Sequence, residues 1–242
     1  MNPPDNKQSL REEIWSALEE SGDDRFPGTV GRIPNFHGRE KAAERLFEQP
    51  AYQDANQIKI NPDSPQTPVR EQALADGKVL YMAVPRLKNR KCFLELDPDS
   101  MDGEPSDWSS IKGANRHGRP VHPGEMKPVD LIVTGVVGVD SDGRRLGKGE
   151  GYSDLEFAIL LEYDRIDRSV PITSTLHPIQ ELEPGRIPSQ PLDITLSQYH
   201  RSDGSVNVDT PGPRPQGLDP DRLTDDQRQN IPILRDLLNV SS

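Results

Sequence analysis

Cysteine is almost absent from this chain, which contains Cys92 alone among its 242 residues. One thiol excludes an internal disulfide and any cysteine-rich metal site. Cys92 lies in the strand-like run KCFLEL, with no pair of His and Asp partners nearby in the sequence to activate it. We therefore expect a buried, unreactive thiol rather than a nucleophile.

Long hydrophobic runs are missing as well. No stretch approaches the ~18 apolar residues that span a bilayer. The N-terminus is polar, whereas a secretion signal carries an apolar segment. We expect a cytoplasmic protein with no membrane partner.

Positive charge is scarce, because 29 Lys and Arg stand against 40 Asp and Glu and the formal net charge is −11. This balance argues against broad nucleic-acid binding and against binding to an anionic membrane surface. An anionic ligand must therefore be held by a local group of basic residues. His117 and His122 lack metal-ligand spacing on a regular element, so we expect them to be loop residues.

Only 32% of the residues are hydrophobic and 24 are proline, so part of the chain must be loop or tail. We expect a large α/β domain over residues 1–198 and a polar, proline-rich tail over 199–242, which is either mobile or carries a docked helix near 223–238. Helices are expected at 7–20, 39–49 and 69–75, and strands at 57–60, 78–84, 91–96, 131–139, 169–177 and 187–196. The strand, helix, strand order over 57–84 predicts a right-handed crossover and a parallel sheet.

Three loops of this predicted fold contain candidate ligand-binding residues. In a parallel sheet the ligand crevice lies beyond the carboxyl ends of the strands, which points to the loops 61–66 and 85–90. The loop 23–38 contains RIPNFHG, with Arg32, Asn35 and His37, a polar set that is unusual for a linker. An ordinary surface loop is the simpler interpretation of that segment.

The clearest motif follows the apolar run 131–139. A DSDG turn leads to Arg144 and Arg145, three glycines at alternate positions and a helix whose expected caps are Ser153 and Asp154. Glycines let main-chain N–H groups approach an anion, and the start of a helix adds unpaired donors and a favourable dipole. With Lys148 as a further charge, the segment suits a phosphate, although a glycine-rich hairpin without a ligand is the alternative. It is neither a P-loop nor a dinucleotide fingerprint, because the GK[ST] ending and the GxGxxG spacing are absent.

Three pieces of the chain, spread over residues 7–197, resemble the 5-formyltetrahydrofolate cyclo-ligase family, also called the methenyltetrahydrofolate synthetases. The first is a K-x-x-L-R helix formed by Lys7, Leu10 and Arg11, and the second is the aromatic-containing segment AYQDANQIKI. The third is the specific signature DxxGxRLGxGxGYYD, here Asp140, Gly143, Arg145, Leu146, Gly147, Gly149, Gly151, Tyr152 and Asp154.

The resemblance implies a three-layer α/β/α sandwich with a mostly parallel sheet, and a reaction that uses ATP and Mg²⁺. In that reaction ATP phosphorylates the formyl oxygen of 5-formyltetrahydrofolate, N10 closes the ring, and phosphate leaves to give 5,10-methenyltetrahydrofolate. Phosphoryl transfer of this kind needs positioning and charge clamps more than a protein nucleophile.

The resemblance also implies roles for individual residues. Lys7 and Arg11 would hold the ATP phosphates, Lys148 and Arg145 would supply the catalytic charges, and Asp154 would hold Mg²⁺. The residues expected around the nucleotide are Arg145, Leu146, Gly147, Lys148, Gly149, Glu150, Gly151 and Tyr152. Those expected to contact the acceptor are Asp63, Gln66, Tyr152 and Ser153.

The chain departs from the family pattern mainly on the folate side. Ser153 replaces the second tyrosine of the signature, and Gln66 stands where the family has a carboxylate after the first strand, with Asp63 close enough to substitute. Ser189 replaces an acidic residue near the C-terminal strand, while Asp193 is retained. Two alternatives therefore stay open: an ATP-binding enzyme of the same fold with another acceptor, and a non-catalytic nucleotide- or RNA-associated protein. We expect a monomer or a homodimer.

Overall fold

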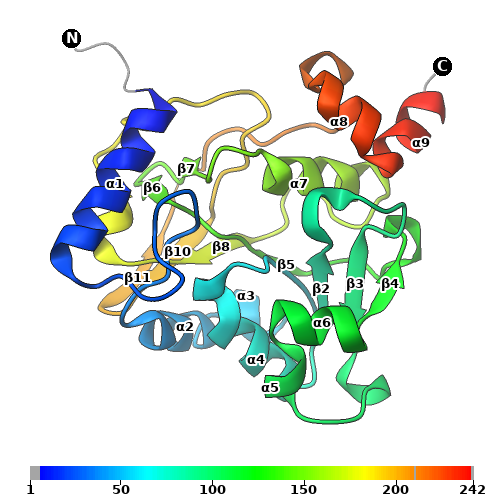
Figure 1. The fold of residues 1–242 in the computed structure, drawn as a ribbon, viewed down its shortest axis with the longest axis horizontal. Helices are drawn as coiled ribbons and strands as arrows, with labels where there is room; N and C mark the ends of the chain where they lie inside the picture. The colour runs from blue at the N-terminus through cyan, green and yellow to red at the C-terminus, as the bar shows by residue number, and fades with distance from the viewer. Residues whose placement is uncertain (1–5, 210, 241–242) are drawn as a thin grey trace.

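The computed structural model describes residues 6–209 and 211–240, and its centre is an eight-stranded mixed sheet (Figure 1). The strand order is β11-β10-β8-β5-β1-β2-β3-β4. Neighbours from β10 to β2 pair parallel, whereas β3, β4 and β11 pair antiparallel. The strands are β1 (Gln57–Ile60), β2 (Val79–Ala83), β3 (Phe93–Leu96), β4 (Arg119–Val121), β5 (Leu131–Val133), β8 (Ile172–Thr175), β10 (Gln198–Arg201) and β11 (Gly204–Asn207). The predicted α/β class with a mostly parallel sheet is confirmed.

Helices cover both faces of the sheet and complete the expected three layers (Figure 1). One face carries α2 (Arg39–Phe47), α3 (Pro50–Gln53), α4 (Thr67–Ala75), α5 (Pro105–Trp108) and α6 (Ile111–His117). The other carries α7 (Tyr152–Glu162), α8 (Asp225–Asn230) and α9 (Pro232–Val240). The predicted crossover is β1, α4, β2: all five residues of β2 are buried, as expected for a strand covered on both faces.

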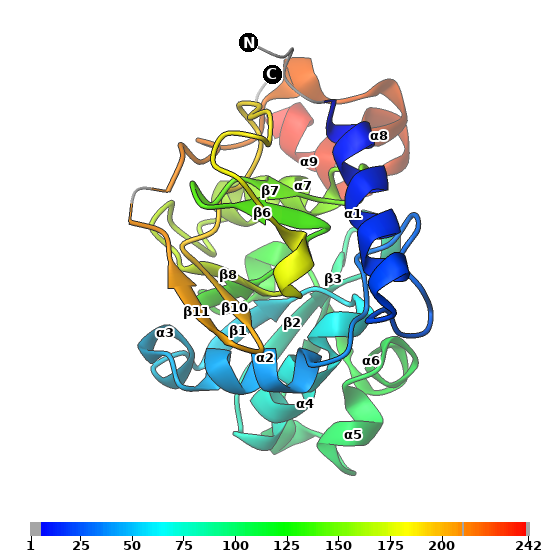
Figure 2. The same cartoon turned by 90° about the vertical axis from the view of Figure 1, so that its left-hand side faces the viewer.

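A second sheet, β7-β6-β9, lies beside α1 (Lys7–Ser21) (Figure 2). Its strands are β6 (Gly138–Asp140), β7 (Arg145–Leu146) and β9 (Glu181–Leu182). Leu10, Ile14 and Trp15 of α1 form a buried cluster with Val137 and Leu146. The helix predicted from its amphipathic pattern is therefore packed against the segment that leads into the glycine-rich loop.

The expectation of one continuous strand over 131–139 is wrong. The run divides into β5 and β6, which belong to different sheets, and residues 134–137 between them are in neither strand. A Cβ at Gly135 would lie 2.8 Å from Oδ2 of Asp63 and 2.9 Å from Cγ1 of Ile33. Both strands are buried, so the run stays apolar throughout and its composition does not reveal the break.

The end of the chain also differs from the expectation. Residues 187–196 form no strand beyond an isolated bridge at Thr195, and the boundary expected at residue 198 falls at the start of β10 inside the large sheet. Tyr199 and His200 are fully buried there. Downstream, Ile233 and Leu234 of α9 are buried in the main core. Residues 199–240 contain few apolar side chains, but several of these are buried against the large sheet or in the main core.

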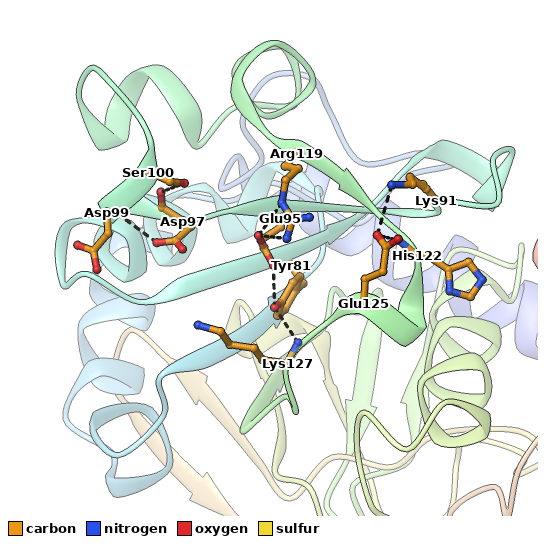
Figure 3. A network of polar contacts seen from close by, with 10 residues as sticks. All are labelled: Tyr81, Lys91, Glu95, Asp97, Asp99, Ser100, Arg119, His122, Glu125 and Lys127. Atoms are coloured by element: carbon orange, nitrogen blue, oxygen red, sulfur yellow. Dashed lines mark hydrogen bonds and ion pairs between the residues drawn. The ribbon is translucent and has the colours of Figure 1, made fainter.

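Polar contacts secure the antiparallel end of the sheet (Figure 3). The Tyr81 hydroxyl donates to Glu95 at 3.0 Å and accepts from the Lys127 main-chain N–H at 3.1 Å. Glu95 also pairs with Arg119, with an N–O distance of 2.6 Å. These bonds tie β2, β3 and β4 to the segment that leads into β5.

The structure shows where the single cysteine and two histidines considered in the sequence analysis lie. Cys92 is fully buried, and burial raises the pKa of its thiol to about 12, which agrees with an unreactive residue. His117 is the last residue of α6, not a loop residue, while the His122 side chain accepts from the Gly124 N–H. Within the two described segments, no three or more His, Cys, Asp or Glu side chains gather in a way that could hold a metal. None of the described helices is long and apolar enough to cross a membrane.

Candidate functional site

A cavity of about 380 Å³ opens at the carboxyl ends of β1, β2 and β5. Its walls come from the loop after β1, the turn after β2, Gly135, the glycine-rich loop, the first turns of α7 and part of the loop between α1 and α2. Open α/β sheets place their ligands in this position. Both loops that the sequence marked after β1 and β2 contribute to the lining.

The glycine-rich loop and the start of α7 form one side of the cavity, which we call the glycine-loop side (the lining residues from Arg145 to Glu156). Gly151, with φ 72°, occupies the N-cap position of α7 and has no side-chain cap. Ser153 and Asp154, expected as caps, lie instead in the first turn, because Gly151 adopts the left-handed conformation that starts the helix. The uncapped end leaves main-chain donors beside the cavity, which suits an anion.

Arg11 holds the glycine-rich loop in place. Its Nε donates to the carbonyl oxygen of Gly147 at 2.6 Å, and a Cβ at Gly149 would lie 3.4 Å from its guanidinium carbon. Gly149 has φ 108°, a conformation that favours glycine. The K-x-x-L-R helix thus meets the signature loop through a hydrogen bond between residues far apart in the sequence.

Basic side chains of the glycine-loop side are paired with acids. Arg145 forms an ion pair with Asp154, and Lys148 pairs with Glu150 at 3.0 Å. The Arg145 side chain is only 4% exposed. Two opposite charges held together in this way stay near the cavity without the cost of an isolated buried charge.

A buried polar network lies beneath this side. Lys59 of β1 forms an ion pair with Glu156 of α7 and donates to Asn61 Oδ1, while Asn61 Nδ2 donates to Ser153 Oγ at 2.8 Å. Lys59 is 2% exposed and Glu156 is 6% exposed. The network fixes which way the Asn61 amide points and presents Ser153 as a polar wall where the family signature has tyrosine.

Asp63 is the carboxylate that the loop after β1 brings to the cavity. Burial raises the pKa of its carboxyl, and the charges of Lys148 and Arg70 oppose the rise. Arg70 is 1% exposed and donates to the main-chain carbonyls of Asn61 and Asp63 at 2.6 and 3.0 Å. Together with the close approach at Gly135, these bonds define the position of Asp63.

The structure brings only some of the expected site residues to the cavity. The lining contains Asp63, Arg145, Gly147, Lys148, Glu150, Gly151, Tyr152, Ser153 and Asp154. Gln66 is fully buried and its amide nitrogen lies 3.5 Å from Thr175 Oγ1, so a ligand in this cavity would not contact it. Leu146 packs against α1, and Lys7 pairs with Asp193 at 2.6 Å outside the lining.

Asn61, Arg86 and Arg32 lie in the three loops that the sequence marked as candidates, although no role was assigned to them there. Two further residues, Lys59 and Glu156, were not expected at the site. Each had a signal in the sequence, because Lys59 interrupts the apolar strand QIKI and Glu156 interrupts the apolar helix LEFAILL. A charge inside an apolar element is rarely buried without a partner. Neither position shows by itself that the other is that partner.

The donor set of the cavity fits a magnesium ion that binds together with phosphate. Asp154 Oδ1 accepts a hydrogen bond from the Arg145 guanidinium and another from the Ile194 main-chain N–H at 2.9 Å. Asp154 Oδ2 has no partner in the described part of the chain. Mg²⁺ in nucleotide sites is held by one or two carboxylates with phosphate oxygens and water. Asp154 through Oδ2, with Glu150 on the same side, satisfies that requirement.

The fold and the site define an α/β protein with a glycine-rich loop beside a cavity at the carboxyl ends of its parallel strands. The sequence model of the 5-formyltetrahydrofolate cyclo-ligase family matches residues 4–199, and the chain belongs to this family. Methenyltetrahydrofolate synthase domain-containing proteins of Bos taurus and Mus musculus are 31% and 32% identical to it over 237 residues, or 96% of this chain. The chain spans 62% and 63% of the lengths of those two proteins.

A solved structure supports the fold. The 5,10-methenyltetrahydrofolate synthetase of Aquifex aeolicus superposes with a TM-score of 0.54 at 18% identity, covering 90% of this chain and 99% of that one. Similarity at this level of sequence identity supports the fold, whereas the reaction depends on the residues of the site.

Proposed function

We propose that this chain catalyses the ATP-dependent cyclisation of 5-formyltetrahydrofolate to 5,10-methenyltetrahydrofolate, with release of ADP and phosphate. The observation that carries the proposal is the glycine-loop side, where Arg145, Lys148 and Asp154 line one cavity beside the uncapped start of α7. Membership of the cyclo-ligase family supports the same reaction. The proposal concerns this chain, which covers part of the length of its longer relatives.

Charge placement accounts for the phosphoryl-transfer step. Lys148 and Arg145 stabilise the negative charge that spreads over the transferring phosphoryl group. Mg²⁺, held by Asp154, neutralises phosphate charge when bound. Lys7 and Arg11 would serve the outer phosphates, and in this conformation they pair with Asp193 and with the Gly147 carbonyl.

The residues that contact the acceptor in this proposal are Asp63, Tyr152 and Ser153. Asp63 faces the cavity with a carboxyl whose pKa is raised by burial, so it is suited to accept or donate a hydrogen bond to the reduced pterin ring. Tyr152 supplies an aromatic wall that packs on the main core. Ser153 adds a hydroxyl held by Asn61.

A second candidate is an ATP-dependent enzyme with a different acceptor. The hydrogen bond between Asn61 and Ser153 favours it, because that part of the wall is polar where a second tyrosine would offer a ring. Tight ATP binding without folate binding in calorimetry would support this candidate. Tight folate binding would count against it.

The deciding assay mixes the purified protein with ATP, Mg²⁺ and 5-formyltetrahydrofolate and follows the absorbance of methenyltetrahydrofolate. We expect product formation that depends on both ATP and the metal, with one ADP released for each product. An Asp154→Asn variant should be inactive under the same conditions. If the wild-type protein gives no product at any pH at which it is folded, the cyclo-ligase proposal is wrong.

A further inference from the structure

Hydrogen bonds run from a buried ammonium group to the wall of the cavity. Lys59 of β1 donates to Asn61 Oδ1, and Asn61 Nδ2 donates to Ser153 Oγ at 2.8 Å. Asn61 and Ser153 line the cavity, whereas Lys59 is 2% exposed and does not. These three residues, which we call the donor chain, join the buried ion pair of Lys59 and Glu156 to a surface that a ligand can reach.

Lys59 fixes the direction of the donor chain. An ammonium group has donors only, so the Asn61 oxygen must face it and the Asn61 amide nitrogen must point away. The ion pair with Glu156 holds the ammonium group in its place. A flipped Asn61 amide would set donors against donors at a residue that is 5% exposed, and an unmade buried hydrogen bond costs free energy. The amide therefore has one orientation.

Regular elements hold both ends of the donor chain. Asn61 follows β1 directly, and its main-chain N–H donates to the Val133 carbonyl at 3.0 Å, which extends the pairing with β5. Side chains two residues apart on an extended strand point to the same face, as those of Lys59 and Asn61 do. Ser153 lies in the first turn of α7. A strand and a helix thus set the geometry of the chain.

The Ser153 hydroxyl is left with an unused donor. Its oxygen accepts from Asn61, so its hydrogen must be donated to another group. The Asn61 amide nitrogen does not take it, because that nitrogen donates both to Ser153 and to the Asp63 carboxyl. Within residues 6–209 and 211–240 the hydroxyl hydrogen has no acceptor. Because Ser153 lines the cavity, the hydrogen is available to a ligand there.

We propose that Ser153 is a specificity-determining residue that donates a hydrogen bond to an oxygen of the bound ligand, and that Lys59 and Asn61 are positioning residues that fix its direction. The ligand atom is a carbonyl oxygen of the acceptor or a phosphoryl oxygen of the nucleotide. The charge of Lys59 polarises the two hydrogen bonds of the chain and strengthens the donor at its end. The identity of the two ligands rests on the proposed function, whereas the direction of the donor rests on the hydrogen bonds alone.

The test is calorimetry of the full chain with two probes, each titrated alone. One is the Mg²⁺ complex of AMP-PNP, a non-hydrolysable analogue of ATP, and the other is 5-formyltetrahydrofolate. We expect Ser153→Ala to weaken the binding of at least one probe by about tenfold or more, which identifies the oxygen, and Ser153→Thr to retain wild-type affinity. Ser106→Ala, at an exposed serine of α5 outside the cavity, is the matched control and should bind both probes as the wild type does.

The positioning role is tested in Lys59→Met/Glu156→Met, which removes the ion pair and leaves the net charge unchanged. Without the ammonium group the Asn61 amide can turn and accept the Ser153 hydrogen. The double variant should therefore bind the same probe about threefold or more weakly. Adding Ser153→Ala should then cost less affinity than it does in the wild type, because the donor is already misdirected. Circular dichroism and urea denaturation show that each variant is folded.

Equal affinity of the wild type and Ser153→Ala for both probes would overturn the donor, and so would a wild-type protein that binds neither probe. Additive losses in the triple variant would overturn the positioning role of Lys59 and Asn61. The outcome is separate from turnover. A probe affinity that depends on Ser153 without methenyltetrahydrofolate formation removes the proposed reaction and keeps the donor, and product formation with no effect of Ser153→Ala on either probe does the reverse.

Discussion

Two parts of one cavity lining differ in how their basic side chains are paired: the glycine-loop side, and the part that contains Arg32 and Arg86. On the glycine-loop side, Arg145 and Lys148 are paired with Asp154 and Glu150, and the network beneath pairs Lys59 with Glu156. In the other part of the lining, the Arg32 and Arg86 side chains have no hydrogen-bond or ion-pair partner within the described residues. A charged side chain in an ion pair is held in place and can be buried, whereas an unpaired one stays hydrated until a ligand binds. The comparison therefore predicts that substitutions beneath the glycine-loop side lower the stability of the fold, whereas substitutions of the two unpaired arginines do not.

The largest expected effect comes from Lys59→Met, which leaves Glu156 buried without its cation. Breaking a buried pair in this way costs roughly 3–5 kcal/mol, whereas replacing both partners with apolar residues is often neutral. Urea denaturation should show that loss for the single variant and a recovery of most of it in Lys59→Met/Glu156→Met. Lys112→Met, at an exposed position, is the control. A single variant as stable as the wild type would mean that the pair is not buried as described.

His200 sharpens the comparison because it is a buried basic residue with no ion-pair partner among residues 6–209 and 211–240. It is 0% exposed, and burial lowers its pKa to about 4. In the unfolded chain His200 takes up a proton near pH 6.5, whereas in the folded chain it does so only near pH 4. The contribution of the neutral side chain to the free energy of unfolding is therefore complete above pH 6.5 and is lost as the pH falls towards 4. At about 1.4 kcal/mol for each pH unit, the loss amounts to about 3 kcal/mol.

The measurement for His200 compares urea denaturation at pH 7.5 and pH 4.5. The His200→Gln variant should lose about 3 kcal/mol less stability over that interval than the wild type. His117→Gln, at an exposed position, should keep the wild-type dependence. Parallel profiles for wild type and His200→Gln would contradict the assignment.

Lys148→Ala tests how much the glycine-loop side contributes to the rate of the proposed reaction. Removing one preorganised charge that faces a developing negative charge lowers kcat by about 100-fold. The absorbance assay measures the fall, and Lys41→Ala, an exposed lysine of α2 outside the cavity, should leave the rate unchanged. A drop confined to KM would instead make Lys148 a ground-state binding residue.

The smallest expected change in stability is at Arg86, and its sign is the opposite. Arg86→Gly relieves a left-handed backbone conformation and should raise the free energy of unfolding by about 1 kcal/mol. Arg116→Gly, within helix α6, should lower it by up to ~1 kcal/mol. Chemical denaturation of the two variants gives the comparison. A destabilised Arg86→Gly would indicate that the arginine side chain has a structural role.

Much of the fold was accessible from the sequence because its signals are local. The crossover β1, α4, β2 follows from periodicity, and the glycine-rich loop follows from residue types within one short segment. The predicted residues that do reach the cavity come largely from that segment. The break at Gly135 was missed because an apolar run looks the same whether it forms one strand or two, and β10 was missed because a few buried residues such as Tyr199 carry it.

By itself the sequence determined the family, the α/β class and the loop that suits a phosphate, since each depends on contiguous motifs or on the spacing of neighbouring residues. Only the tertiary structure decided that Asp63 reaches the cavity and Gln66 does not, because the close approach of Asp63 to Gly135 and the hydrogen bonds from Arg70 fix that loop. It also decided that Lys59 meets Glu156 and that Arg32 and Arg86 line one cavity. These contacts join residues far apart in the chain, and long-range pairing is the information that local patterns do not contain.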